Sequence, residues 1–172
     1  YVLDQVCRDV QEWMAKGIKP VRISVNFSKA HLHNPDLAKK ILAVLQKYDV
    51  PSRYIEIELT EMSGYENYET LLDFVRTMHE SGVSTSIDDF GTGYSSLNLL
   101  KDLNVDIIKL DKSFLNNMEK RKKNDVIVIK NIIQMVNELD MEVVAEGVET
   151  MEQADFLRGM HCCICLLYTS PS

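Results

Sequence analysis

Polar side chains recur near the carboxyl ends of five short segments that are rich in valine and isoleucine. These side chains are Asn26, Glu58, Asp88 with Asp89, Lys109 with Asp111, and Glu146 with Glu149. Carboxylate and amide oxygens are the ligands that Mg²⁺, Mn²⁺ and Ca²⁺ prefer. If the segments bring these groups together, the sequence predicts a divalent-cation site with one lysine beside it.

The adjacent residues Asp88 and Asp89 fit such a site best. Two neighbouring carboxylates repel each other, and some would stay protonated unless cations removed the penalty. Asp88, on the same inward face as Glu58, could bridge two ions, with Asp89 reaching the second ion or its water. Lys109 would add positive charge where a phosphate or an attacking hydroxide lies, although a lysine there could also be a plain ion-pair partner. A single acidic residue at a strand end is usually a cap or turn residue, but five such ends together favour a functional site.

Alternating segments predict the elements that position these residues. Apolar runs predict strands, and the stretches between them carry apolar residues at helical spacing. The predicted strands cover 21–28, 54–61, 84–90, 105–111 and 142–149. The first predicted helix is the opening segment with Leu3 to Met14, and the second is capped by Asn34 and begins at Pro35. A third contains Leu71 to Met78 and stops near Gly82, and a fourth covers 124–139. The last begins with a capping box of Thr150 and Gln153.

Strands that alternate with helices predict a parallel sheet, either open or closed into a barrel. In residues 21–28, Val21, Ile23, Val25 and Phe27 share one face, and Arg22, Ser24, Asn26 and Ser28 share the other. A strand covered on both faces should be apolar throughout, so these polar faces must look into a shared interior. The sequence therefore predicts an α/β fold of the TIM-like (β/α)8 barrel class, with its site at the carboxyl ends of the strands. Deeper in that interior, Arg22 and Glu56 are predicted to form a buried structural pair.

Composition excludes several other classes of function. The 172 residues carry a formal net charge of −7, which argues against non-specific nucleic-acid binding. No apolar stretch approaches the roughly 20 residues that cross a membrane, so we expect a cytoplasmic location, although a parent protein could be membrane-tethered. The cysteines Cys7, Cys162, Cys163 and Cys165 match no zinc pattern and fit a reducing compartment. The glycines after Asp89 do not form a P-loop and are expected to let the chain turn sharply and move.

Five segments together identify a resemblance to a known family. "VNFS", "ELTE", "DDFGTGYSSL", "IKLDKSF" and "VVAEGVET" follow one another as do the signature segments of the EAL domain family of bacterial cyclic di-GMP phosphodiesterases. The resemblance implies a TIM-like barrel that hydrolyses cyclic di-GMP to linear pGpG with two Mg²⁺ or Mn²⁺ ions. Chemically, two such ions would lower the pKa of water and clamp the attacking and leaving oxygens.

The resemblance also implies a role for each matching residue. Asn26, Glu58 and Asp88 would bind the first metal, and Asp88, Asp89 and Glu146 would hold the second, partly through water. Lys109, Asp89 and Glu149 would be catalytic, with Lys109 positioning the attacking water. Glu61 would hold the "GTGYSSL" loop, which would connect the metal site to the surface of a homodimer, and Asp111 and Glu149 would support the site.

The chain also departs from the family. It starts after the strand with the family's name-giving Glu-Ala-Leu segment, whose glutamate is a further metal ligand, and a complete barrel takes about 250 residues. We therefore expect an incomplete barrel that lacks its first strands, with a partial EAL domain over 1–162 and a non-native tail over 163–172. In that tail, Cys163 stands at a family aspartate and Leu166 at a family glutamine. The isolated chain is expected to be inactive or poorly folded, because an open barrel exposes strand edges.

Two alternatives belong to other classes. One is a non-catalytic EAL-like module that binds cyclic di-GMP or a partner protein, although such modules usually lose metal ligands and this span keeps them. The other, a barrel aldolase or glycosidase, leaves the clustered ligands unexplained. Family members are often fused to sensor or diguanylate-cyclase-like domains.

Overall fold

The computed structural model describes residues 1–60, 68–91, 100–115, 123–162 and 164–167. The chain divides into two compact units, and one boundary between them along the sequence falls within strand β3 (Ser84–Phe90): residues 84–86 belong to the first unit and residues 87–90 to the second. The hydrogen-bonded strand order follows the sequence, from β1 to β6. β1 pairs with β2, β4 with β5, and β5 with β6, each time in parallel. Parallel neighbours joined by helices are the arrangement predicted for an incomplete (β/α) barrel.

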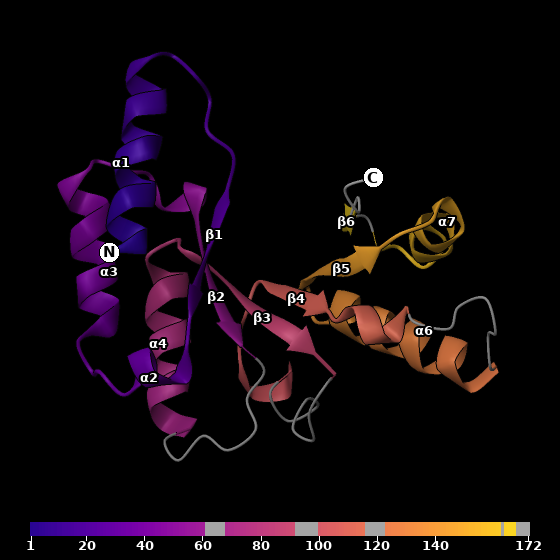
Figure 1. The fold of residues 1–172 in the computed structure, drawn as a ribbon. Helices are drawn as coiled ribbons and strands as arrows, with labels where there is room; N and C mark the ends of the chain where they lie inside the picture. The colour runs from indigo at the N-terminus through magenta and orange to yellow at the C-terminus, as the bar shows by residue number, and fades with distance from the viewer. Residues whose placement is uncertain (61–67, 92–99, 116–122, 163, 168–172) are drawn as a thin grey trace. The chain divides into compact units, whose positions relative to one another are not determined.

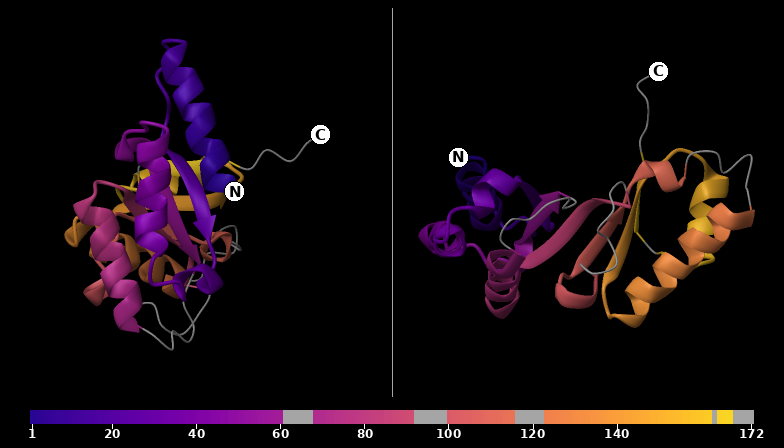
Figure 2. Two further views of the ribbon diagram at one scale, coloured as in Figure 1. Left: turned by 90° about the vertical axis from the view of Figure 1, so that its left-hand side faces the viewer. Right: turned by 90° about the horizontal axis from the view of Figure 1, so that it is seen from below.

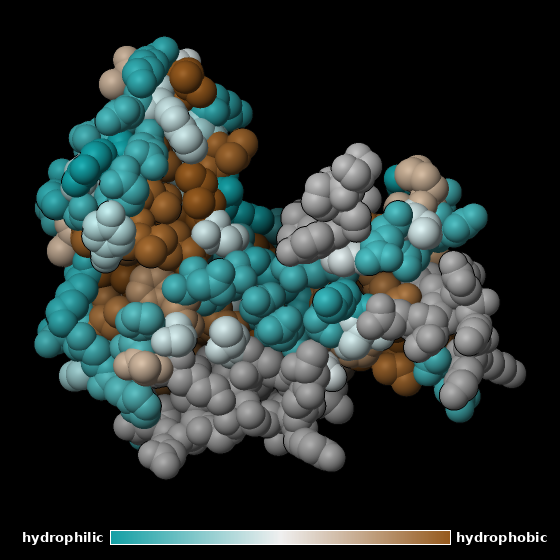
Figure 3. All heavy atoms as spheres, viewed as in Figure 1, coloured by the Kyte–Doolittle hydropathy of each residue, from teal (hydrophilic) through white to brown (hydrophobic). Residues whose placement is uncertain are grey.

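The first unit packs helices against β1 and β2 (Figure 1). Its elements are α1 (Val2–Ala15), β1 (Ile23–Phe27), α2 (Lys29–Leu32), α3 (Leu37–Lys47), a 3-10 turn η1 (Ser52–Tyr54), β2 (Ile55–Thr60) and α4 (Tyr68–Glu80). In β2, Ile55, Ile57 and Leu59 are completely buried. Burial of one such side chain contributes about 1.5–3 kcal/mol, so this strand is the centre of the unit's core. Figure 3 shows the unit's hydrophobic side chains gathered between its more polar helix surfaces.

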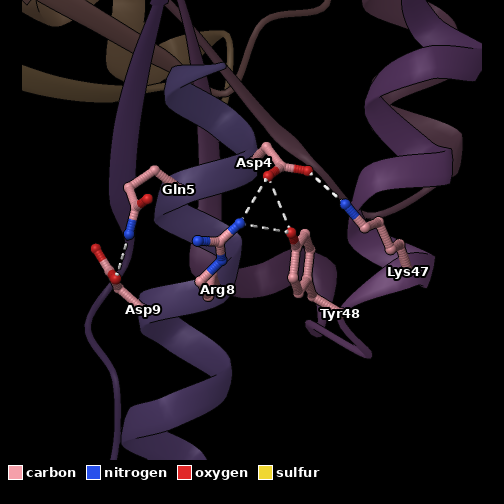
Figure 4. A network of polar contacts seen from close by, with 6 residues as sticks. All are labelled: Asp4, Gln5, Arg8, Asp9, Lys47 and Tyr48. Carbon is pink, nitrogen blue, oxygen red and sulfur yellow. Dashed lines mark hydrogen bonds and ion pairs between the residues drawn. The ribbon is translucent and has the colours of Figure 1, made fainter.

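A polar network on the outside of the first unit joins α1 to the end of α3 (Figure 4). The Asp4 carboxylate accepts hydrogen bonds from Lys47 Nζ at 2.8 Å and from the Tyr48 hydroxyl at 2.9 Å. Arg8 also lies 3.5 Å from this carboxylate. The hydrogen bond from Lys47, together with that from Tyr48, holds the pKa of Asp4 below its ordinary value. The network fixes the two helices to each other at the surface, above the buried contacts of Cys7 and the residues around it.

The second unit packs two helices on its central strand. Its elements after β3 are β4 (Ile107–Leu110), a 3-10 turn η2 (Lys112–Phe114), α6 (Lys123–Glu138), β5 (Glu142–Val148), α7 (Met151–Arg158) and β6 (Ile164–Leu167). α6 and α7 both contact β5, and Figure 2 shows α6 lying along this strand. Ile129, Ile133 and Val136 of α6 are buried, as the helical spacing of these residues requires.

The predicted elements exist, with corrections at their ends. Val21 was expected on the apolar face of the first strand, but β1 begins only at Ile23 and Val21 is 72% exposed. The third helix begins at Leu37 instead of Pro35, because the Asn34 side chain accepts a hydrogen bond from the Asp36 backbone N–H and forms a turn ahead of the helix. The predicted capping box at the start of α7 is confirmed, since Thr150 and Gln153 bond each other's backbone N–H groups.

Residues 164–167 form β6 beside β5, in the stretch predicted to be a non-native tail. The origin of that stretch stays a prediction. In the part of the chain that the structure describes, no helix is both long and apolar enough to span a membrane.

Candidate functional site

Asn26 and Glu58 lie side by side in the first unit. The parallel register of β1 and β2 makes their Cα atoms partners. Because neighbouring strands lie about 4.8 Å apart and partnered residues point to the same face, the two side chains leave the sheet together. Asn26 is exposed, whereas Glu58 is only 6% exposed. The structure thus brings together an amide oxygen and a carboxylate that the sequence predicted as ligands.

Two residues before Glu58 on β2, Glu56 forms a polar group with Arg22 and Ser86. Glu56 is buried, and its two carboxylate oxygens have different partners. The hydroxyl of fully buried Ser86 donates a hydrogen bond to Oε1 at 2.8 Å, and Arg22 Nε lies 3.3 Å from Oε2. The predicted pair of Arg22 and Glu56 is therefore confirmed, but its burial is wrong for one partner, because the Arg22 side chain is 34% exposed. Sequence reasoning missed Ser86, although its position two residues before Asp88 places it on the same strand face.

Asp88 and Asp89 lie near the carboxyl end of strand β3, in different environments. Asp88 is partly buried, whereas Asp89 is exposed and has a φ of 53°. Left-handed backbone is uncommon for residues other than glycine, and aspartate tolerates it better than most. Such conformations cluster at functional sites, where the surrounding structure holds them in place. The φ of Asp89 therefore marks a local departure from extended backbone near the carboxyl end of β3.

Lys109 of β4 and Glu146 of β5 form an ion pair between neighbouring strands of the second unit. Lys109 Nζ lies 4.0 Å from Glu146 Oε1. The side chain of Lys109 is only 9% exposed, and that of Glu146 is 27% exposed. Burial of an ammonium group costs free energy unless an opposite charge lies nearby. The Glu146 carboxylate supplies that charge and holds the Lys109 ammonium close to it. The site therefore holds a shielded positive charge next to one of the predicted metal ligands.

Asp111 and Glu149 follow the ends of β4 and β5. Asp111 is the N-cap of η2, and its Oδ1 accepts a hydrogen bond from the Ser113 N–H at 2.8 Å. Burial raises the pKa of Asp111, but the hydrogen bonds from Ser113 and the nearby charge of Lys112 outweigh this effect and keep the pKa below its ordinary value. Glu149 is exposed, and its backbone N–H donates to Gln153 Oε1 at 2.7 Å. Both residues thus begin the turns that follow the strands, and Glu61 lies outside the described residues.

The predicted ligands fall into two groups. Asn26 and Glu58 belong to the first unit, and Asp88, Asp89 and Glu146 belong to the second. Among the described residues, no cluster of three or more His, Cys, Asp or Glu side chains is arranged to hold a metal ion. The assignment of metal ligands therefore stays a proposal, supported within each unit by the placements above.

The parallel strand order is that of an incomplete (β/α) barrel, and charged side chains lie near the carboxyl ends of its strands within each unit. The model of the EAL domain family matches residues 1–165, and the chain belongs to this family. The predicted resemblance and the predicted fold class are thus confirmed.

The relatives that the chain resembles include bacterial signalling proteins. It is 36% identical over 162 residues to cyclic di-GMP phosphodiesterase NbdA of Pseudomonas aeruginosa, covering 94% of this chain and 21% of that protein. It is 32% identical over 162 residues to the bifunctional diguanylate cyclase/cyclic di-GMP phosphodiesterase MucR of the same species, covering 94% of this chain and 24% of that protein. The chain therefore spans about a fifth to a quarter of the length of these relatives.

Solved structures agree with this fold. The EAL domain of Mycobacterium smegmatis DcpA matches with a TM-score of 0.86 and 30% identity, covering 95% of this chain and 74% of that one. The MucR phosphodiesterase in complex with c-di-GMP matches with a TM-score of 0.82 and 32% identity, covering 94% of this chain and 65% of that one.

Proposed function

We propose that this chain is part of a cyclic di-GMP phosphodiesterase, which hydrolyses one phosphodiester bond of the cyclic dinucleotide and releases linear pGpG. Membership of the EAL family and the names of the relatives support this substrate and this reaction. The observation that carries the proposal is the buried Lys109 ammonium 4.0 Å from Glu146, since it places a positive charge at the carboxyl end of the strands, where an anionic substrate would bind.

The site would hold two Mg²⁺ or Mn²⁺ ions. Asn26, Glu58 and Asp88 would ligate the first ion, and Asp88, Asp89 and Glu146 the second, partly through water. The donor set fits these ions, because all five side chains offer hard oxygen atoms and the structure makes Asn26 and Glu58 direct neighbours. When bound, such ions lower the pKa of water and neutralise negative charge on the phosphodiester.

The protein's own charges would then favour an anionic substrate. The carboxylates of Glu58, Asp88, Asp89 and Glu146 would neutralise charge on the two divalent ions. The Lys109 ammonium would add positive charge beside them, where a phosphodiester group, which is singly negative, would bind. Lys109 would also orient the attacking water by donating a hydrogen bond, and Glu146 would limit the directions that the ammonium can take.

Several wider features belong to the same proposal. The enzyme would act in the cytoplasm as a homodimer, with Glu61 holding the "GTGYSSL" loop toward the partner. Further sensor or diguanylate-cyclase-like domains would regulate it, and the bifunctional relative MucR supports such an arrangement. Asp111 and Glu149 would support the site by fixing the turns after β4 and β5.

The decisive experiment is a hydrolysis assay. Purified full-length protein with cyclic di-GMP and Mg²⁺ should produce pGpG, detected by chromatography. The Asp88→Asn variant should lose at least about 100-fold in kcat, since a proposed bridging ligand loses its charge. Tight binding of cyclic di-GMP by the wild type without any pGpG would instead establish the non-catalytic receptor function. Substantial activity of Asp88→Asn would contradict the ligand assignment.

A further inference from the structure

Phe114, in the turn after β4, presses against the glycine that follows the Asp88–Asp89 pair. Gly91 has a φ of 100°, and a Cβ atom added to it would lie 2.1 Å from two ring carbons of Phe114. Real Cβ atoms do not approach other atoms this closely, so the aromatic ring occupies the space that any other residue would need. The contact therefore constrains the position of the backbone at Gly91, two residues after Asp89, which is one of the proposed metal ligands.

Lys112, at the other end of the same turn, makes a second close approach. Gly147 has a φ of 67°, and an added Cβ would lie 2.5 Å from Lys112 Cβ and 3.5 Å from its Cα. Gly147 directly follows Glu146, another proposed ligand. The stem of Lys112 therefore packs against the backbone of β5 where this ligand leaves the strand.

The turn that makes both contacts is itself anchored. η2 begins immediately after Asp111, whose side chain caps it, and Asp111 lies two residues after Lys109. The turn thus touches the segment after β3 with Phe114 and the end of β5 with Lys112, while its first residue continues from β4. All of these residues belong to the second unit.

We infer that η2 is a spacer that sets the distance between the Asp88–Asp89 segment and Glu146, with Phe114 and Lys112 as positioning residues for the second metal ion. This inference rests on the proposed function and deepens it. Neither residue touches the metal, and both act through the glycines beside the ligands. Metal affinity depends strongly on ligand spacing, because Mg²⁺ and Mn²⁺ tolerate little distortion of their coordination shell.

The first test measures Mn²⁺ binding, which needs no catalysis. Titration of the full-length protein with Mn²⁺, followed by the electron paramagnetic resonance signal of the free ion, should show two bound ions. Phe114→Leu should weaken the second by about tenfold, within the range seen when residues that orient metal ligands are replaced. Phe74→Leu is the matched control: it makes the same change at a buried phenylalanine of α4 in the first unit and should lower the melting temperature but not the Mn²⁺ affinity.

The possible outcomes separate the inference from the proposed function. A wild-type protein that binds no Mn²⁺ contradicts the proposed metal site and the spacer together. Two-ion binding by the wild type that is unchanged in Phe114→Leu contradicts the spacer alone. An equal loss in Phe114→Leu and Phe74→Leu also contradicts it, since the effect would then be general destabilisation.

A second test uses the contact between Gly147 and Lys112. Gly147→Ala should weaken the second Mn²⁺ at least tenfold, and adding Lys112→Gly should restore part of the affinity, because it removes the Cβ that the new methyl group meets. Lys112→Ala keeps this Cβ and should restore nothing. The left-handed backbone penalty at position 147 is the same in both double variants, so their difference isolates the contact. Equal affinities of the two double variants would overturn the role of Lys112.

Discussion

The Lys109 ammonium lies 4.0 Å from the Glu146 carboxylate, and the lysine side chain is almost completely buried. The two residues come from the neighbouring strands β4 and β5, whose parallel register pairs Lys109 with Val144, two residues before Glu146. The lysine therefore reaches along the strand direction toward the carboxyl end of β5. A buried cation held in this way keeps its position without reorganising, which is the property that electrostatic catalysis requires.

Replacement of this lysine should abolish catalysis while leaving the fold intact. Lys109→Met keeps most of the side-chain volume but removes the charge, so we expect kcat for cyclic di-GMP hydrolysis to fall at least about 100-fold, as for loss of one charge-stabilising group. The exposed Lys101 provides the control, since Lys101→Met makes the same change away from the site and should keep wild-type kcat. A kcat for Lys109→Met within threefold of the wild type would remove the lysine from the mechanism.

Asn26 should contribute one ligand to the first metal ion. Asn26→Ala removes the amide oxygen beside Glu58, and the apparent Mn²⁺ affinity measured by titration should fall about tenfold, whereas Asn26→Asp should keep or raise it. Asn104→Ala, at another exposed asparagine, should bind Mn²⁺ like the wild type. If Asn26→Ala also binds like the wild type, Asn26 is not a ligand.

The group formed by Arg22, Glu56 and Ser86 should be a stability element. Glu56→Ala removes the acceptor of the Ser86 hydroxyl and the carboxylate that lies 3.3 Å from Arg22 Nε. We expect a loss of about 1–3 kcal/mol in the free energy of unfolding, at the lower end because about a third of the arginine side chain reaches solvent. The double variant Arg22→Met with Glu56→Leu should recover only part of this loss in denaturant titrations, because it removes the unbalanced charge while the Ser86 hydroxyl still lacks its acceptor. A double variant less stable than Glu56→Ala would show that the charges themselves stabilise the interior.

Local sequence signals predicted the helices and strands more accurately than they predicted the contacts between them. The capping box of Thr150 and Gln153 and the full extent of β3 follow from patterns within a few residues. The start of α3 was misplaced because a side-chain turn at Asn34 competes with a helix cap. Strand alternation placed Asn26 and Glu58 on the polar faces, and the register makes them neighbours.

Contacts between distant segments had no local signal. Gly91 was expected to let the chain turn, and Gly147 lay within a predicted strand. Phe114 and Lys112, which fill the space beside these glycines, lie 23 and 35 residues away in the sequence. Ser86 likewise has no distinguishing feature in the sequence, and only the folded structure brings its hydroxyl within hydrogen-bond distance of Glu56. Such pairings arise only from tertiary packing, so periodicity and propensity could not reveal them.

Cys7 should make the protein less stable at alkaline pH. Burial, together with the negative charge of Asp4, raises the pKa of this thiol to about 11, whereas an unfolded cysteine titrates near 8.5. The folded protein therefore keeps a proton that the unfolded chain releases between these values, so this contribution to stability is complete below about pH 8.5 and is lost as pH rises toward 11. The free energy of unfolding should decrease by up to about 1.4 kcal/mol per pH unit more than in Cys7→Ala, which lacks the thiol. Parallel urea titrations from pH 7.5 to 10.5 measure this difference, and identical slopes for the two proteins would show that the thiol is not shielded. Because the thiol stays protonated in the native state, Cys7 should also resist alkylation by iodoacetamide at pH 8 until the protein unfolds.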